Sequence, residues 1–142
     1  MMIPTPWHQH VSPEGPFSDV YEPAEDTFLL LDGLEGDAEA LKGARVDICL
    51  EVGCGSGVVS AFLASIFGPT PLYLCTDINP VAGLCTVETA NRNKVDLQPI
   101  ITNLTSRKRE PLSTQIFQVL KMAVLANCLA YQGRGAIGTV SL

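Results

Sequence analysis

Three alternating glycines mark the part of the sequence best suited to holding a small ligand. The run LEVGCGSGVVSAF places Gly53, Gly55 and Gly57 between two apolar segments, and Glu51 precedes the first glycine by two positions. Glycines between a strand and a helix allow a ligand to approach the main chain, where backbone N–H groups point outward. The pattern therefore predicts a cofactor-binding loop.

A second acidic residue, Asp77, ends the next apolar segment, twenty residues after Gly57. A carboxylate at the end of that strand can accept hydrogen bonds from both hydroxyls of a ribose. The alternative interpretation is structural, with Asp77 capping a helix that begins near Pro80. A dinucleotide fingerprint requires its third glycine at the position of Val58, which disfavours an NAD-binding protein.

Strands and helices are expected to alternate around this loop. Short apolar runs indicate buried strands, and Asn79 followed by Pro80 is typical of a helix start. Such alternation implies parallel strands joined by right-handed crossovers, so the expected fold class is α/β. In chain order the prediction is a helix over 23–36, a helix over 37–42, a strand over 46–52, a helix over 57–68, a strand over 72–77, a helix over 79–94 and a strand over 98–103.

Composition limits the possible functions. A chain of 142 residues is long enough for one domain, and its net charge of −6 predicts no direct binding to nucleic acid. Five cysteines without a Cys-x-x-Cys pair predict reduced thiols and a cytoplasmic or nuclear location. The amino terminus lacks a signal-peptide pattern, and His8 and His10 lack further ligands at metal-binding spacing, so no metal site is expected.

The Glu-x-Gly-x-Gly-x-Gly form resembles motif I of S-adenosylmethionine-dependent methyltransferases. Three stretches, FSDVYEPAEDTFLLLD, ICLEVGCGSGVVSAFLAS and LYLCTDINPVAGLCTVETANRNKV, together resemble the N-terminal half of the eukaryotic HemK-type glutamine methyltransferase. The resemblance implies an incomplete Rossmann-like class I methyltransferase fold, with the first three parallel strands and their crossover helices. It also implies three parts: a flexible N-terminal arm at 1–17, a partial methyltransferase domain at 18–104 and an unassigned tail at 105–142.

That family implies an activity and partners. Its enzyme methylates the glutamine side chain of the Gly-Gly-Gln motif in a translation release factor, and it has been linked to N-methylation of lysine. It works with a small zinc-binding activator subunit. By this resemblance the expected cofactor is S-adenosylmethionine, and the expected substrate of the full-length family is a release factor. No membrane partner is expected.

The resemblance also assigns roles to residues at the cofactor. Thr27 would contact the methionine carboxylate, Glu51 and the glycines would line the same pocket, and Asp77 would hold the ribose. Asn103 stands where the family has an aspartate beside the adenine, and an amide with one acceptor and two donors predicts a weaker or reoriented contact. The complete expected set is Thr27, Glu51, Gly53, Gly55, Gly57, Asp77, Asn103 and Leu104.

The family's catalytic signature, Asn-Pro-Pro-Tyr, does not occur in the sequence. Asn79-Pro80 is interpreted as a helix cap, so no catalytic residue is assigned. Nothing after Leu104 resembles the family, and one hydrophobic helix is expected over 113–131, too polar to span a membrane. Without an obvious fourth strand, the first strand is expected to be a bare edge of the sheet.

If the chain is a truncated form, three hypotheses about its function follow. The first is a methyltransferase whose catalysis is impaired because a substrate-positioning group is missing. The second is a non-catalytic module that retains binding of the cofactor or the activator subunit. The third is an unstable product. Stabilisation by the cofactor would favour the second reading over the third.

Overall fold

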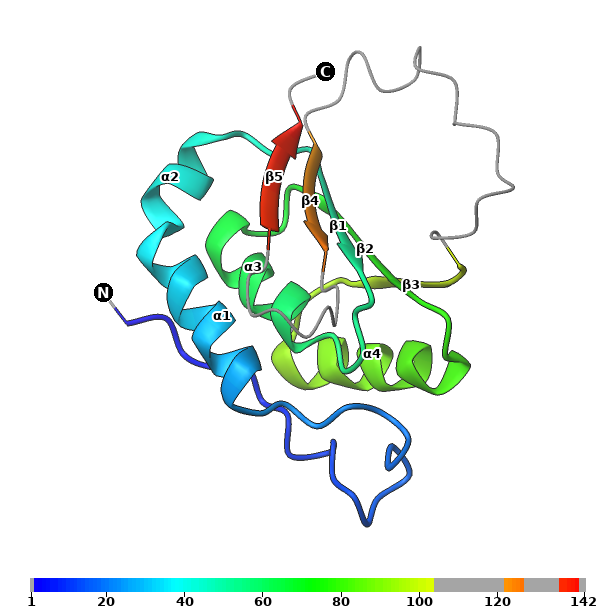
Figure 1. Ribbon diagram of the computed structural model, residues 1–142. Helices are drawn as coiled ribbons and strands as arrows, with labels where there is room; N and C mark the ends of the chain where they lie inside the picture. The colour runs from blue at the N-terminus through cyan, green and yellow to red at the C-terminus, as the bar shows by residue number, and fades with distance from the viewer. Residues whose placement is uncertain (1, 104–121, 127–135, 141–142) are drawn as a thin grey trace.

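The computed structural model describes residues 2–103, 122–126 and 136–140, which form one five-stranded sheet with helices packed on it (Figure 1). Each expected helix and strand up to residue 103 is present within two residues of its predicted ends. The helices are α1 (Glu25–Gly36), α2 (Ala38–Gly43), α3 (Val58–Phe67) and α4 (Pro80–Asn93). The strands are β1 (Ile48–Val52), β2 (Leu72–Asp77), β3 (Gln98–Ile101), β4 (Met122–Ala126) and β5 (Ala136–Val140).

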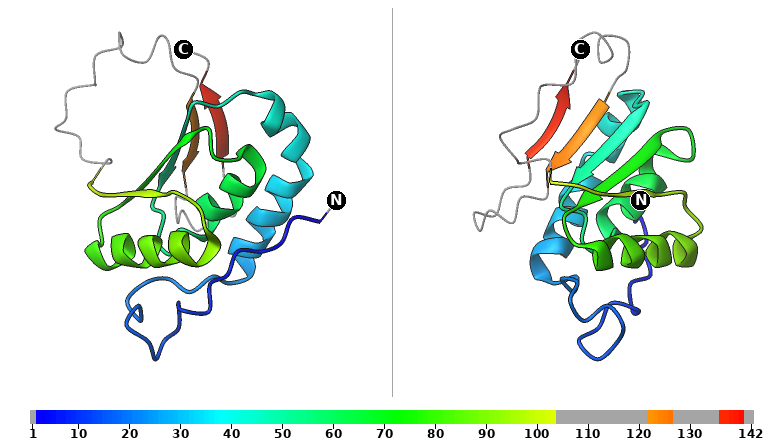
Figure 2. Two further views of the ribbon diagram at one scale, coloured as in Figure 1. Left: turned by 180° about the vertical axis from the view of Figure 1, so that it is seen from behind. Right: turned by 90° about the vertical axis from the view of Figure 1, so that its right-hand side faces the viewer.

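The order of the strands confirms the α/β class. The sheet runs β3-β2-β1-β4-β5, with β1 parallel to both β2 and β4, β2 parallel to β3, and β5 antiparallel to β4. Helix α3 connects β1 to β2 and α4 connects β2 to β3, and two right-handed crossovers in one direction place both helices on one face. In the right-hand view of Figure 2, α1, α2 and α3 lie behind the sheet.

The prediction of a helix over 113–131 is wrong where the structure describes it. Residues 122–126 are β4, which pairs with β1 from Ile48↔Met122 to Val52↔Ala126, and the rest of that range lies outside the described residues. A short apolar run fits a strand or a helix equally well by periodicity. Pairing satisfies the backbone groups of β1 that would otherwise be exposed, so the expected bare edge is also corrected.

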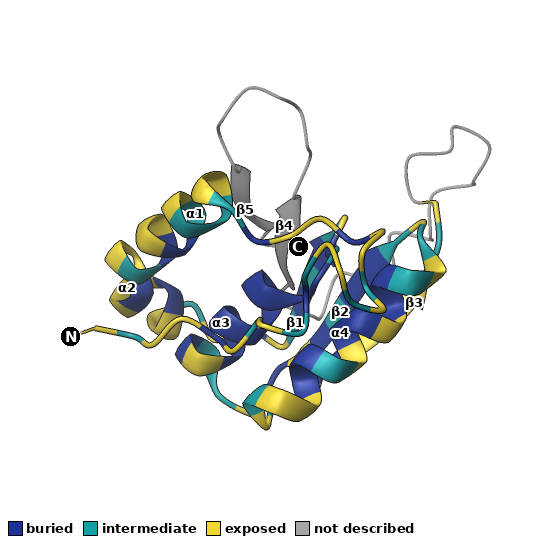
Figure 3. Ribbon diagram, turned by 90° about the horizontal axis from the view of Figure 1, so that it is seen from below, coloured by how far each residue is buried: buried dark blue, intermediate teal, exposed yellow. Residues whose placement is uncertain are grey.

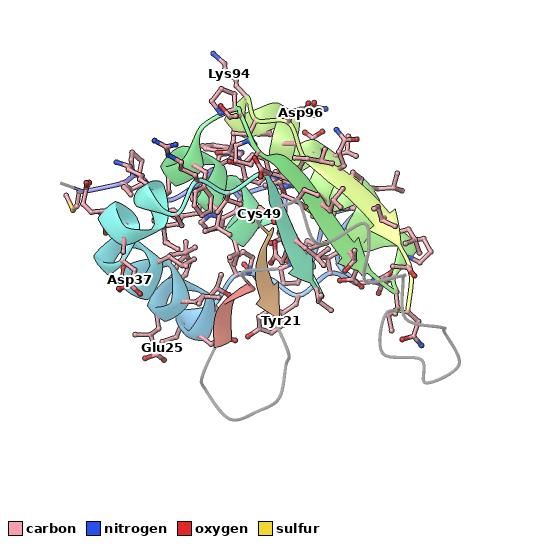
Figure 4. All side chains as sticks on the ribbon, turned by 90° about the horizontal axis from the view of Figure 1, so that it is seen from above. Tyr21, Glu25, Asp37, Cys49, Lys94 and Asp96 are labelled. Carbon is pink, nitrogen blue, oxygen red and sulfur yellow. The ribbon has the colours of Figure 1, made fainter. Side chains whose placement is uncertain are left out.

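The core lies between the sheet and the helices. Residues of β1 alternate, with Cys49 and Glu51 buried and their neighbours half-buried, and Tyr73 and Cys75 of β2 are buried on the same side. Helix α3 is buried nearly all round, as its apolar sequence predicts for an inner helix (Figure 3). Seen from above, Cys49 is central, whereas charged side chains lie at the periphery, namely Glu25, Asp37, Lys94 and Asp96 (Figure 4).

The N-terminal segment, residues 2–20, lies against α4. Val11 and Val20 are buried with Ala82 and Cys85 of α4 in a second, smaller apolar cluster, and Phe17 packs at its margin. A few apolar side chains among many polar residues thus give this segment a place to dock, which composition alone does not reveal. Within the described parts of the chain, no helix is long and apolar enough to cross a membrane.

Candidate functional site

The glycine loop, residues 53–57, connects β1 to α3 at the carboxyl end of the parallel strands. Its three glycines have positive φ angles, 76° at Gly53, 53° at Gly55 and 79° at Gly57, a conformation that side chains disfavour. The N–H groups of Gly53 and Cys54 both donate to the Thr76 carbonyl, at 2.8 and 2.9 Å. These two bonds fix the loop to the end of β2.

Gly55 and Gly57 face different surroundings. A Cβ atom added at Gly57 would lie 2.9 Å from Oγ1 and 3.2 Å from the Cα of Thr86, so only glycine allows α4 to pack this closely. A Cβ atom at Gly55 would meet nothing within 4 Å. The loop therefore has a packed side against α4 and an open side where a ligand could approach the main chain.

Asp77 lies beside the open side of the loop. Its Oδ2 accepts from the Gly55 N–H and its Oδ1 accepts from the Asn79 N–H, each at 2.9 Å. The residue is half-buried, and each carboxylate oxygen has a second acceptor position. The carboxylate can thus hold the loop and still accept hydrogen bonds from a group with two neighbouring hydroxyls.

Glu51 lies in the interior, with 0 % of its surface exposed. The Ser60 hydroxyl of α3 donates to its carboxylate, and the Thr76 hydroxyl donates to its carbonyl at 3.0 Å. This arrangement places Glu51 beneath the loop, tying β1 to α3 and β2. The resemblance predicted that Glu51 lines the cofactor pocket. In this conformation, however, the Glu51 side chain has no accessible surface.

Of the remaining expected cofactor residues, the structure describes Thr27 and Asn103. Thr27 is in the first turn of α1, and its hydroxyl accepts from the Ala24 N–H at 3.2 Å. Asn103 is exposed beyond the end of β3, next to Thr102, whose N–H donates to the Asp77 carbonyl at 2.9 Å. That bond brings Asn103 toward Asp77, whereas Leu104 lies outside the described residues.

The pair Asn79-Pro80 has the structural role that the sequence predicted. The Asn79 side chain accepts from the Val81 N–H at 3.0 Å, and Pro80 occupies the first turn of α4. This is an ordinary helix cap. Asp77 does not cap α4 itself, because its Oδ1 contact closes the turn that precedes the cap.

Two threonines of α4 hold the packed side of the loop, and neither was among the site residues predicted from the sequence. The Thr86 hydroxyl donates to the Gly55 carbonyl at 3.3 Å, and the Thr89 hydroxyl lies 2.6 Å from the Ser56 carbonyl. Both side chains are fully buried. The available signal was two hydroxyl residues, three positions apart, on the face of a helix that must pack inward.

The cysteine in the loop is unsuited to act as a nucleophile. The Cys54 thiol is buried, 3.5 Å from the Thr86 hydroxyl, and burial, together with the charge of Glu51, raises its pKa to about 12. The same causes raise the pKa of Cys49 to about 12. Among residues 2–103, 122–126 and 136–140, no group of three or more His, Cys, Asp or Glu side chains could hold a metal ion.

A sheet with this strand order and these crossover helices is consistent with a partial Rossmann-like methyltransferase fold, and comparison with known proteins agrees. The chain is 69 % identical over 100 residues to human "Methyltransferase HEMK2", an alignment that covers 70 % of this chain and 45 % of the human protein. Mouse "Methyltransferase HEMK2" is 66 % identical over 102 residues, 72 % of this chain and 46 % of the mouse protein.

A fission yeast protein named "eRF1 methyltransferase catalytic subunit mtq2" (Schizosaccharomyces pombe) is 45 % identical over 83 residues, 55 % of this chain and 36 % of the yeast protein. No protein-family model matches the chain. These findings confirm the predicted resemblance to HemK-type release-factor methyltransferases, and the likeness concerns their N-terminal region. The chain spans less than half the length of these relatives.

Proposed function

We propose that this chain binds S-adenosylmethionine at the open side of the glycine loop, as the cofactor-binding part of a HemK-type protein methyltransferase. The observation that carries the proposal is the Asp77 carboxylate, hydrogen-bonded to the Gly55 N–H at 2.9 Å with acceptor capacity remaining. The names of the three relatives support methyl transfer as the general activity. When bound, S-adenosylmethionine supplies an electrophilic methyl group.

Each residue of the loop region has a role in this proposal. Asp77 accepts from the two ribose hydroxyls, Gly55 leaves room for the cofactor against the main chain, and Gly53, exposed at the loop's start, lies beside it. We assign the adenine to the side of Asn103 and Leu104, and the methionine carboxylate to Thr27. Glu51 supports the site from below.

We further propose that this chain alone transfers no methyl group to a release factor. The sequence contains no Asn-Pro-Pro-Tyr, and a one-step transfer depends on a group that orients the substrate amide nitrogen toward the methyl. The part played by this chain in our proposal is binding of the cofactor, the activator subunit or both, in a reducing compartment such as the cytoplasm or nucleus. Four buried free cysteines fit that compartment: Cys49, Cys54, Cys75 and Cys85.

The edge formed by β3 and α4 is where we propose that the small zinc-binding activator subunit binds. β3 is at the edge of the sheet, and large apolar side chains are exposed beside it, including Leu84 (66 %), Val87 (42 %) and Ile101 (46 %). The Ile101 side chain lies against Gly83 of α4, the residue that precedes Leu84, so the exposed end of β3 adjoins this helix. Exposed apolar surface beside an open strand is typical of a protein-binding site.

The relative from fission yeast is named a catalytic subunit, a term used for one part of an assembly. To test the site, Leu84→Glu should abolish binding of the activator in a pull-down. Leu29→Glu is the matched control, because Leu29 is exposed to a similar extent, 64 %, on α1. If Leu84→Glu still bound the activator, the activator would have to bind at another surface.

A calorimetric titration with S-adenosylmethionine tests cofactor binding. The wild-type chain should bind with a dissociation constant of about 1–100 μM, equivalent to roughly −8 to −5 kcal/mol. Asp77→Ala should remove the binding heat, because the loop loses its anchor and the ribose its acceptor. Asp32→Ala, at an exposed position of α1, should bind like the wild type. Equal affinity in Asp77→Ala would refute the ribose assignment.

Transfer of a radiolabelled methyl group to the release factor should stay at background for this chain. Turnover comparable with that of a full-length HemK-type enzyme would overturn the non-catalytic part of the proposal. If the chain showed neither binding heat nor a cooperative thermal transition, the hypothesis that it is an unstable product would be favoured instead.

A further inference from the structure

The N-terminal segment runs alongside α4 in the opposite direction. The Trp7 N–H donates to the Asn93 side chain at 2.7 Å, and the Asn93 amide returns a bond to the Trp7 carbonyl at 3.0 Å. Farther along the segment, the Asp19 carbonyl accepts from the Asn79 side chain at 3.3 Å. As the segment advances from residue 7 to 19, its partners on α4 therefore move back from 93 to 79.

His10 lies between these two attachments and reaches the glycine loop through α4. Its Nε2 is 2.7 Å from the Thr89 hydroxyl, which lies 2.6 Å from the Ser56 carbonyl in the loop and 3.0 Å from the Cys85 carbonyl of its own helix. A threonine hydroxyl has a single hydrogen, and both carbonyls only accept. The Thr89 hydroxyl donates to a carbonyl, so the imidazole must donate Nε2–H to Thr89.

From this chain of hydrogen bonds we infer that His10 is a positioning residue for the cofactor loop, acting through Thr89. The inference rests on the proposed function of the loop as the S-adenosylmethionine site. By donating to Oγ1, His10 directs the Thr89 hydrogen toward the Ser56 carbonyl and holds the packed side of the loop against α4. The N-terminal segment then supports the cofactor site through α4.

The surroundings of the His10 ring favour the neutral form that this role requires. Its Nδ1 is buried and has no hydrogen-bond partner among the described residues, so a proton added at Nδ1 would be left unpaired. The ring of Phe17 packs edge-on against it, with 5.9 Å between centroids. Burial lowers the pKa of His10. The charge of Glu88 and a hydrogen bond to the Cys85 backbone oppose this effect, and the charges of Arg92 and His8 add to it.

The first test follows amide hydrogen exchange in the loop without added cofactor, at pH 7.5. In His10→Ala the Gly57 N–H, bonded to the Cys54 carbonyl, should exchange about three- to tenfold faster, the effect expected for loss of one hydrogen bond. His10→Gln keeps an Nε2 donor and should restore wild-type exchange. His8→Gln is the matched control, because the polar contact of His8 is to Pro6 within the same segment.

The second test measures S-adenosylmethionine affinity in the same variants. His10→Ala should bind about three- to tenfold more weakly, and His10→Gln and His8→Gln should match the wild type. Unchanged exchange in His10→Ala, or equal losses in His10→Ala and His10→Gln, would overturn the inference. A wild-type chain that binds no cofactor would refute the proposed function alone, because the exchange measurement needs no cofactor. If His10→Ala fails to fold, Thr89→Val provides the same comparison against Thr89→Ser.

Discussion

The two sides of the glycine loop place opposite demands on the same residue type. Gly57, on the packed side, is buried and leaves no space for a Cβ atom next to Thr86, whereas Gly55, on the open side, has no atom within 4 Å of that position. Both glycines have positive φ angles. One glycine thus serves the packing of α4, and the other keeps the main chain accessible.

The acidic residues around the loop repeat this contrast. Glu51 is fully buried and bonded to Ser60, while Asp77 is half-buried and bonded to the Gly55 N–H at the open side. A motif that looks uniform in sequence therefore combines a structural half with a ligand-facing half. Substitutions can separate the two halves, because one should change stability and the other affinity.

The largest effect is expected for Gly57→Ala. Strain at a positive φ, together with the contacts at 2.9–3.2 Å to Thr86, should lower the free energy of unfolding by about 2–4 kcal/mol. Chemical denaturation measures this difference. Gly33→Ala, at an exposed and unobstructed position in α1, is the control and should gain about 0.5–1 kcal/mol. If Gly57→Ala left the free energy of unfolding nearly unchanged, the claim that this side of the loop is tightly packed against Thr86 would be refuted.

Gly55→Ala should have the opposite pattern of effects, with a small loss of stability and a larger loss of cofactor affinity. With no steric contact, only the positive φ of 53° opposes the change, so the loss of unfolding free energy should be about 1 kcal/mol. The new methyl group would occupy the open side, and S-adenosylmethionine affinity should fall at least about tenfold, equivalent to about 1.4 kcal/mol. Calorimetry and denaturation on one sample distinguish the two effects, and wild-type affinity would contradict the assignment.

The pH dependence of stability should sharpen the role of the N-terminal segment. Because the pKa of His10 is lowered by burial, the unfolded chain binds more protons than the folded chain just below the ordinary histidine pKa of 6.5. Stability should therefore be complete above about pH 7 and fall as the pH drops below 6.5. His10→Gln should show a smaller fall in thermal melts between about pH 7 and 5, and an identical profile would contradict the burial of a neutral His10.

The smallest effect concerns the thiol on the packed side. With its pKa raised to about 12, Cys54 should remain unmodified by iodoacetamide at pH 8 in the folded chain and react once denaturant is added. Peptide mass spectrometry reads the modification at this residue. Rapid labelling of folded Cys54 would show that the side of the loop against α4 is open.

Local patterns account for what the sequence predicted of the fold. The strands and helices up to residue 103 follow from short apolar runs, a helix cap at Asn79 and glycine stops. The strand at 122–126 was missed because its state depends on pairing with β1, a partner about seventy residues earlier in the chain. Apolar periodicity within the segment cannot predict that pairing, because it depends only on neighbouring residues.

The candidate site divides in the same way. The glycines and Asp77 were predicted from their spacing, and the structure brings them together. His10, Thr86 and Thr89 have ordinary polar side chains in a segment and a helix, and only the packing of α4 between segment and loop reveals their contacts. The burial of Glu51 was equally inaccessible, because it depends on which face of β1 the helices cover.

The most direct measurement of the central claim is an NMR titration of the ¹⁵N-labelled chain with S-adenosylmethionine. The account predicts that the amide signals of Gly53 and Gly55 shift in proportion to bound cofactor, with a smaller change at Gly57 on the packed side. Signals of Gly33 and Gly36 in α1 should stay in place. Saturating cofactor that leaves the Gly53 and Gly55 signals unmoved would contradict the claim that this loop is the cofactor site.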